Sequence, residues 1–157
     1  MRKETKTWIR RGGALLFLLY LLALAYFLFF SETYGRVVIG EGEYHYNLIP
    51  FQEIRRFWIY REQVGTFAWV SNLLGNVIGF LPFGFILPVI FRNFRSFWSI
   101  MFGGFLFSLL VETIQLVTKV GCFDVDDLIL NTLGAILGYL AFMLCDKIRR
   151  MYYGKKI

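Results

Sequence analysis

Four long apolar segments constrain the fold of this chain more than any other feature. They run over residues 12–30, 72–91, 97–118 and 128–145, and Glu112 is the only charged side chain among them. Each segment is long enough for a helix to cross the roughly 30 Å hydrocarbon layer of a bilayer. Because 57% of the residues are hydrophobic, a soluble domain of 157 residues could not cover its apolar surface. The sequence therefore predicts an all-α membrane protein, a bundle of four transmembrane helices forming a single domain over residues 1–157.

The first apolar segment follows a basic start, "MRKETKTWIRR", which is also typical of a secretory signal peptide. A signal peptide ends at a small-x-small cleavage site, and the residues "LFFSETYG" at the end of this segment offer none. We therefore interpret the first segment as a retained membrane anchor.

Charged residues divide unevenly between the two sides of the predicted bundle. Of the 17 lysines and arginines, 12 lie before the first segment, between the second and third, or after the fourth. The positive-inside rule then places both termini in the cytoplasm. The net charge of +6 reports this topology, so we do not expect nucleic-acid binding. Cys122 and Cys145 fall on opposite sides and are not expected to form a disulfide with each other.

The longest connecting segment covers residues 31–71 and is predicted to be extracytoplasmic. Its part "GRVVIGEGEYHYNLIPF" contains a short β-branched run, which favours a small hairpin. In the part that follows, "PFQEIRRFWIYREQ", apolar residues share one helical face. This pattern fits a helix lying in the membrane interface and an ordinary ordered loop equally well. Arg55 and Arg56 would lie near phosphate head groups in the first case.

Polar side chains occupy the outer halves of the second, third and fourth segments. Small residues at four-residue spacing, such as Gly75 with Gly79 and Gly134 with Gly138, allow helices to approach closely and to bring these groups into one layer. An ionisable residue in the bilayer is costly, so Glu112 is a functional candidate. The amides are equally compatible with interhelical hydrogen bonding. The residues of this layer are Asn76, Glu112, Gln115, Asp124, Asp127 and Asn131.

The acidic start of the fourth segment exceeds what helix capping requires. One aspartate is enough to cap a helix N-terminus, whereas Asp124, Asp126 and Asp127 all lie there. We interpret Asp126 as a solvated loop residue.

Four motifs occur in order along the chain: "NLIPF" at 47–51, "NLLGNVIGFLPFGF" at 72–85, "ETIQ" at 112–115 and "FDVDDLILNTLGAILGY" at 123–139. This ordered set of motifs resembles the VanZ-like family. The resemblance implies a bacterial cytoplasmic-membrane protein of the cell envelope. The namesake of the family is linked to reduced sensitivity to teicoplanin, a glycopeptide antibiotic with a fatty-acyl tail. The resemblance implies no defined biochemical activity.

The first functional hypothesis is that the protein engages an amphiphile at the outer leaflet and contributes to glycopeptide resistance. Its partners would be membrane lipids together with a lipoglycopeptide such as teicoplanin or a lipid-linked cell-wall precursor. Apolar helices would hold the tail, and polar residues would bind the head group. No cofactor or metal is expected. The candidate binding residues are Asn47, Arg55, Arg56, Asn76, Glu112, Gln115, Asp124, Asp127 and Asn131.

The alternative hypothesis is an intramembrane enzyme that modifies a lipid head group. Glu112 and Asp127 would act as general acid and base, or carboxylates of the layer would hold a divalent cation. The sequence contains no Ser–His or Cys–His arrangement and no phosphate loop to support it. A proton-coupled carrier and a structural subunit are further, weaker alternatives.

Overall fold

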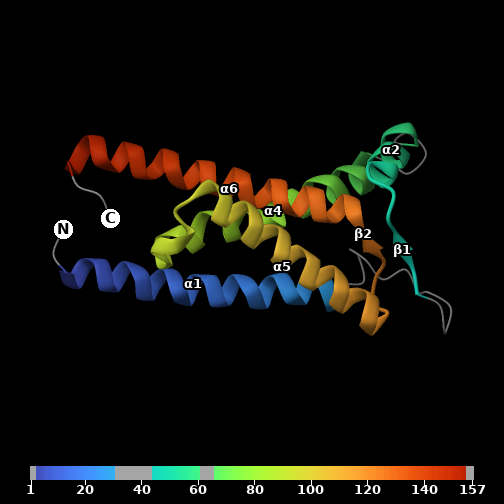
Figure 1. Ribbon diagram of the computed structural model, residues 1–157, viewed down its shortest axis with the longest axis horizontal. Coiled ribbons are helices and arrows are strands. Elements are labelled where there is room, and N and C mark those ends of the chain that lie inside the picture. The colour runs from blue at the N-terminus through green and yellow to red at the C-terminus, as the bar shows by residue number, and fades with distance from the viewer. Residues whose placement is uncertain (1–2, 31–43, 61–65, 155–157) are drawn as a thin grey trace.

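The computed structural model describes residues 3–30, 44–60 and 66–154, and four helices in this part are long and apolar enough to cross a membrane (Figure 1). The predicted bundle of four long helices is confirmed in this form. A short helix, α2 (Gln52–Ile59), and two very short strands, β1 (Tyr46–Asn47) and β2 (Phe123–Asp124), accompany it. The four long helices are α1 (Lys3–Phe30), α4 (Thr66–Ile90), α5 (Phe97–Thr118) and α6 (Val125–Tyr153).

Three of the four helices are longer than predicted, while α5 has its predicted bounds of 97–118. The helix α1 starts at Lys3 rather than at residue 12, and α6 runs over Val125–Tyr153 rather than over 128–145. Hydropathy marks only the part of a helix that lies in hydrocarbon. The charged flanks continue the helix because its backbone hydrogen bonds do not depend on apolar side chains.

The bundle has two distinct ends (Figure 1). The start of α1 and the end of α6 lie at one end, which we call the terminal end. The helix α2 and the strands β1 and β2 lie at the opposite end, which we call the α2 end. The 3-10 turn η1 (Arg92–Phe94) joins α4 to α5 on the side of the terminal end.

The closest helix contact is a glycine seam between α4 and α6. A Cβ atom added at Gly138 would lie 2.0 Å from the carbonyl oxygen of Leu81, and one at Gly134 would lie 2.2 Å from that of Val77. On the facing helix, a Cβ at Gly84 would lie 1.8 Å from the carbonyl oxygen of Ala135. Backbones this close leave no room for a methyl group, so these positions require glycine.

The predicted role of Gly75 and Gly79 in this contact is wrong. Among the described residues, no atom outside the neighbouring backbone of α4 lies within 4 Å of a Cβ built at Gly75, and Gly79 faces Leu24 of α1. The carbonyl of Gly79 accepts a hydrogen bond of 2.9 Å from the hydroxyl of Tyr20, which fastens α1 to α4. The four-residue spacing is present, but Gly79 lies in the contact between α1 and α4 and not in the contact between α4 and α6.

The buried core lies where α4, α5 and α6 meet. It contains Phe83, Ile100, Ala135, Tyr139 and Phe142, all 6% exposed or less. Aromatic rings fill much of this core and fix α4 relative to its neighbours. Many other apolar side chains on the four long helices are exposed, and a bilayer would cover them.

Candidate functional site

The short helix α2 is held against α6 by the carboxylate of Asp126. The helix begins after Phe51, which has a left-handed backbone with φ of 65° and offers no side-chain cap. The orphan N–H groups of a helix start need acceptors. Here the N–H of Phe51 and the N–H of Ile54 both donate to Asp126, the latter at 3.0 Å. Asp126 is 1% exposed, so its interpretation as a solvated loop residue is wrong.

A two-residue parallel bridge provides the second fastening at this end. Tyr46 pairs with Phe123, and Asn47 pairs with Asp124. The N–H of Phe123 also donates to the carbonyl of His45 at 3.1 Å. The hairpin predicted for residues 35–51 lies partly outside the described residues. Its described part contains β1, which pairs with β2, the strand directly before α6.

Asp124 connects three segments of the chain at its position before α6. Its side chain caps α6 by accepting from the N–H of Asp126 at 2.8 Å. It also accepts from the side-chain amide of Asn47 at 3.3 and 3.4 Å. Its own N–H donates to a carboxylate oxygen of Glu112 at 3.1 Å. Burial raises the pKa of Asp124 above its ordinary value, although the hydrogen bonds it accepts oppose that rise.

Glu112, Asp124, Asp126 and Asp127 form one set of neighbouring carboxyl groups, which we call the carboxyl layer. Glu112 is 2% exposed and is held by α5, whereas the three aspartates come from the start of α6 and the residue before it. Asp127 accepts from the side-chain amide of Asn76 on α4. The layer therefore joins α4, α5, α6 and α2 through neutral N–H donors.

Two of the predicted amide side chains form their hydrogen bonds outside the carboxyl layer. The side-chain amide of Gln115 donates to the carbonyl of Leu28 at 3.3 Å and so links α5 to α1. The amide of Asn131 donates to the hydroxyl of Ser108 at 2.9 Å, one turn farther along α6. Both contacts are interhelical hydrogen bonds of the kind that the sequence left open.

Arg55 and Arg56 lie exposed on α2, beside a series of exposed apolar side chains. Arg56 forms an ion pair of 2.6 Å with Glu53, and partial burial raises the pKa of Glu53. We call residues 44–60 the α2 segment. Its exposed apolar side chains are Tyr44, Tyr46, Leu48, Ile49, Phe51, Trp58, Ile59 and Tyr60, which are 47–64% exposed.

Among residues 3–30, 44–60 and 66–154, no group of three or more His, Cys, Asp or Glu side chains is placed to hold a metal ion. Burial and neighbouring carboxyl groups raise the pKa of Cys122, which keeps its thiol protonated and poorly nucleophilic. Cys122 and Cys145 are unpaired, as expected. The carboxylates of the carboxyl layer accept hydrogen bonds from backbone N–H groups and from the side-chain amide of Asn76.

Comparison with known proteins places the chain in a family. The family model described as VanZ/LLP1 matches residues 17–146. The chain belongs to the VanZ/LLP1 family. Protein VanZ of Enterococcus faecium is 32% identical to this VanZ/LLP1 protein over 132 residues, and the match covers 82% of this chain and 72% of the relative. No solved structure matches the chain.

Family membership and the four apolar helices together identify a multi-pass membrane protein. The matched residues include all of α4, α5 and the carboxyl layer. The resemblance seen in the sequence motifs is thus confirmed at the level of the family.

Proposed function

We propose that this VanZ/LLP1 protein engages an acyl-tailed amphiphile at the outer leaflet of the bacterial cytoplasmic membrane and so contributes to glycopeptide resistance. The amphiphile would be teicoplanin or a lipid-linked cell-wall precursor. The similarity to Protein VanZ and the family's link to teicoplanin support the connection with resistance. The distribution of basic residues supports an orientation with both termini in the cytoplasm, which puts the α2 end at the outer leaflet.

The exposed surface of the α2 segment is the observation that carries this proposal. Trp58 is 60% exposed and Ile59 is 57% exposed, although neither lies in one of the four spanning helices. Exposed apolar residues outside the hydrocarbon region indicate a surface for a lipid or a lipid-like ligand. Tryptophan and tyrosine side chains favour the level of the head groups, where the polar part of an amphiphile would lie.

Arg55 and Arg56 give the α2 segment a positive charge that complements an anionic head group. A guanidinium group forms paired hydrogen bonds with a carboxylate or a phosphate, the two groups that make a head group anionic. The carboxyl layer supports this surface because Asp126 holds the N–H groups of α2 and Asp124 holds Asn47. Direct contact of Glu112 or Asp127 with a head group stays a prediction.

The test compares antibiotic sensitivity in a susceptible Gram-positive host at matched membrane levels of each variant. Wild type should raise the inhibitory concentration of teicoplanin more than that of vancomycin, because vancomycin has no acyl tail. Trp58→Ala and the double variant Arg55→Gln with Arg56→Gln should lose this protection. Trp98→Ala is the matched control, since Trp98 is 62% exposed on α5 at the opposite end of the bundle.

Equal protection against both antibiotics would refute the role of the acyl tail. Full protection by Trp58→Ala would refute the role of the α2 segment. Glu112→Gln and Asp127→Asn then test the carboxyl layer in the same assay. If only these two lose protection at normal membrane levels, the head group binds to the layer and not to α2.

A further inference from the structure

A cavity of about 530 Å³ lies at the terminal end, beside α6 and the connection between α4 and α5. This volume is in the range of small-molecule binding sites. The cavity is unrelated to the α2 segment, which lies at the opposite end of the bundle (Figure 1). Its lining combines charged and apolar side chains: Arg95, Tyr139, Leu140, Phe142, Met143, Leu144, Asp146, Lys147 and Arg150.

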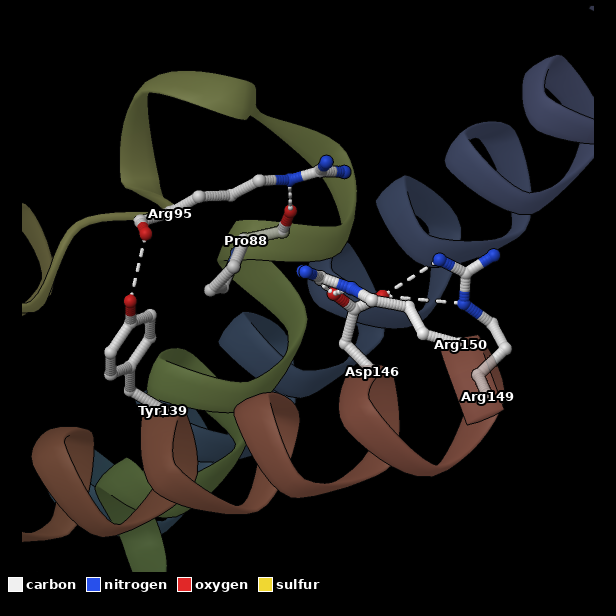
Figure 2. Close-up of polar contacts among 6 residues, drawn as sticks. All are labelled: Pro88, Arg95, Tyr139, Asp146, Arg149 and Arg150. Carbon is white, nitrogen blue, oxygen red and sulfur yellow. Dashed lines mark hydrogen bonds and ion pairs between the residues drawn. The ribbon is translucent and has the colours of Figure 1, made fainter. Parts of the chain in front are cut away.

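Arg95 is built into the wall of this cavity by two hydrogen bonds (Figure 2). Its Nε donates to the carbonyl of Pro88 at 3.0 Å, which satisfies one of the acceptors left at the end of α4. The hydroxyl of Tyr139 on α6 donates to the carbonyl of Arg95 at 2.7 Å. These bonds hold the guanidinium group of Arg95 at the end of α4 and its backbone against α6.

The cavity has an excess of positive charge. Three cations line it, Arg95, Lys147 and Arg150, against the single carboxylate of Asp146. That carboxylate also pairs with Arg149 at 2.8 Å and with Arg150 (Figure 2), so its charge is already compensated. An anion would therefore meet a positive site.

The surroundings of Arg95 strengthen this field. Burial lowers the pKa of Arg95, Asp146 raises it, and the nearby charges of Arg92, Arg10 and Arg149 lower it. Cations from α1, from the connection after α4 and from α6 thus converge on one region. Such convergence is unfavourable without an anion and becomes favourable when one binds.

Apolar side chains continue the cavity away from its charges. Leu140, Met143 and Leu144 are 44%, 42% and 59% exposed and lie on the part of α6 that is apolar enough to span a membrane. A free anion would leave these side chains uncovered, whereas a lipid with an anionic head group would cover both parts of the lining. Basic pockets between membrane helices bind such lipids.

We propose that this cavity binds an anionic phospholipid, with its phosphodiester head group at Arg95, Lys147 and Arg150 and its acyl chains against Leu140 and Met143. The lipid would come from the leaflet at the terminal end, which the charge distribution assigns to the cytoplasmic side. The site is independent of the amphiphile proposed for the α2 end.

The experiment uses the full-length protein in detergent and native mass spectrometry with phosphatidylglycerol, phosphatidylcholine and the water-soluble head group glycerophosphoglycerol. Wild type should bind phosphatidylglycerol in preference to the other two. Lys147→Gln should weaken this binding about fivefold, the usual contribution of one basic residue to an anionic lipid surface. Met143→Trp should weaken it as well by filling the cavity without changing any charge.

Arg11→Gln is the matched control. Arg11 lies exposed on α1 at the same end but does not line the cavity, so its loss should leave binding unchanged. The proposal is overturned if phosphatidylcholine binds equally well, if glycerophosphoglycerol binds as tightly as the lipid, or if Arg11→Gln and Lys147→Gln act alike. Should Met143→Trp fail to fold, Lys147→Gln against Arg11→Gln still decides the question.

Discussion

Both ends of the bundle bury carboxylates, but the two ends satisfy them with different partners. At the α2 end, Asp124 and Asp126 accept hydrogen bonds from backbone N–H groups and from an amide. At the terminal end, Asp146 accepts from Arg149 and Arg150. Most donors at the α2 end are backbone N–H groups, which have fixed positions. The donors at the terminal end are the side chains of Arg149 and Arg150, which are 21% and 47% exposed.

This difference indicates what each end is built to do. Hydrogen bonds to backbone N–H groups hold one segment of chain in one place, so the carboxylates at the α2 end position a surface. Ion pairs with arginine leave charge that a ligand can share, so the terminal end is suited to binding an anion. Four substitutions test this contrast.

The largest effect is expected at the glycine seam, because this contact sets the distance between α4 and α6. Gly138→Ala places a methyl group 2.0 Å from the carbonyl oxygen of Leu81, and the two backbones must separate. Overpacking of this kind costs about 1–3 kcal/mol or more, so little folded protein is expected. Monodisperse yield in detergent and thermal unfolding measure the loss.

Gly75→Ala is the control for that substitution. It adds the same methyl group on α4 at a position where no described atom outside the neighbouring backbone of α4 lies within 4 Å, and alanine favours a helix over glycine by roughly 0.5–1 kcal/mol. Gly75→Ala should therefore be neutral or slightly stabilising. Equal losses from both variants would contradict the seam as the element that sets the helix spacing.

Asp126→Asn should loosen the α2 end alone. Both carboxylate oxygens of Asp126 accept from N–H groups, whereas an asparagine offers one oxygen and turns an NH₂ group toward the second donor. The unsatisfied donor costs about 1–3 kcal/mol, which corresponds to roughly 5–150-fold faster amide exchange in α2. Hydrogen exchange over residues 52–59 measures it.

The terminal end provides the internal control for Asp126→Asn. Exchange near the end of α6 should not change, because no contact of Asp126 reaches it. A loss of protection along the whole of α6 would show that Asp126 stabilises the bundle in general and does not serve α2 specifically.

The sequence was enough to predict the spanning helices, because apolar length reports burial in a bilayer directly. It also predicted the glycines of α6 that pack closely, since small residues at four-residue spacing mark a helix contact. It could not identify their partner on α4. Gly134 and Gly138 lie against the carbonyls of Val77 and Leu81, and the α4 glycine in this seam is Gly84, which lies against Ala135. The sequence does not give these pairs because they depend on the rotation of one helix against another.

The role of Asp126 was hidden for a similar reason. The helix α2 begins after Phe51, which has no side chain that can cap it. This missing cap was the one signal in the sequence that an acceptor had to come from elsewhere. The acceptor that replaces the missing cap lies 75 residues away along the chain, beyond the reach of local patterns. Asn131 and Gln115 were predicted to share one layer, but each bonds to a different helix, because spacing gives depth and not direction.

Asp146→Asn tests the ion pairs of the terminal end and should have a smaller effect than Asp126→Asn. The side chain of Arg150 is 47% exposed, so solvent screens the pair. We expect a loss of stability of about 1 kcal/mol or less, and a weaker loss in about 1 M salt. Thermal unfolding at low and high salt measures both. The effect of Asp126→Asn should persist in salt, because its partners are neutral. A salt-insensitive Asp146→Asn would remove this distinction between the two ends.

The smallest effect is expected from protonation of Asp124. Because burial raises the pKa of Asp124, the folded α2 end binds more protons than the unfolded chain at pH values between the ordinary and the raised pKa. Stability of that end should therefore increase as the pH falls from the raised pKa toward the ordinary pKa of the group, which is opposite to ordinary acid destabilisation. Asp124→Asn removes this titration but keeps an acceptor for the N–H of Asp126, since asparagine is also a good N-cap.

The variant should match wild type within about 0.5 kcal/mol at pH 7 and should depend less on pH. A weaker dependence should remain, because the pKa of Glu53 is also raised. Comparing α2 amide exchange of the two proteins at each pH cancels the intrinsic pH dependence of exchange. If acid instead loosens α2 more in wild type than in the variant, Asp124 stays ionised in the folded state, and the α2 end then resembles the terminal end in keeping its carboxylates charged.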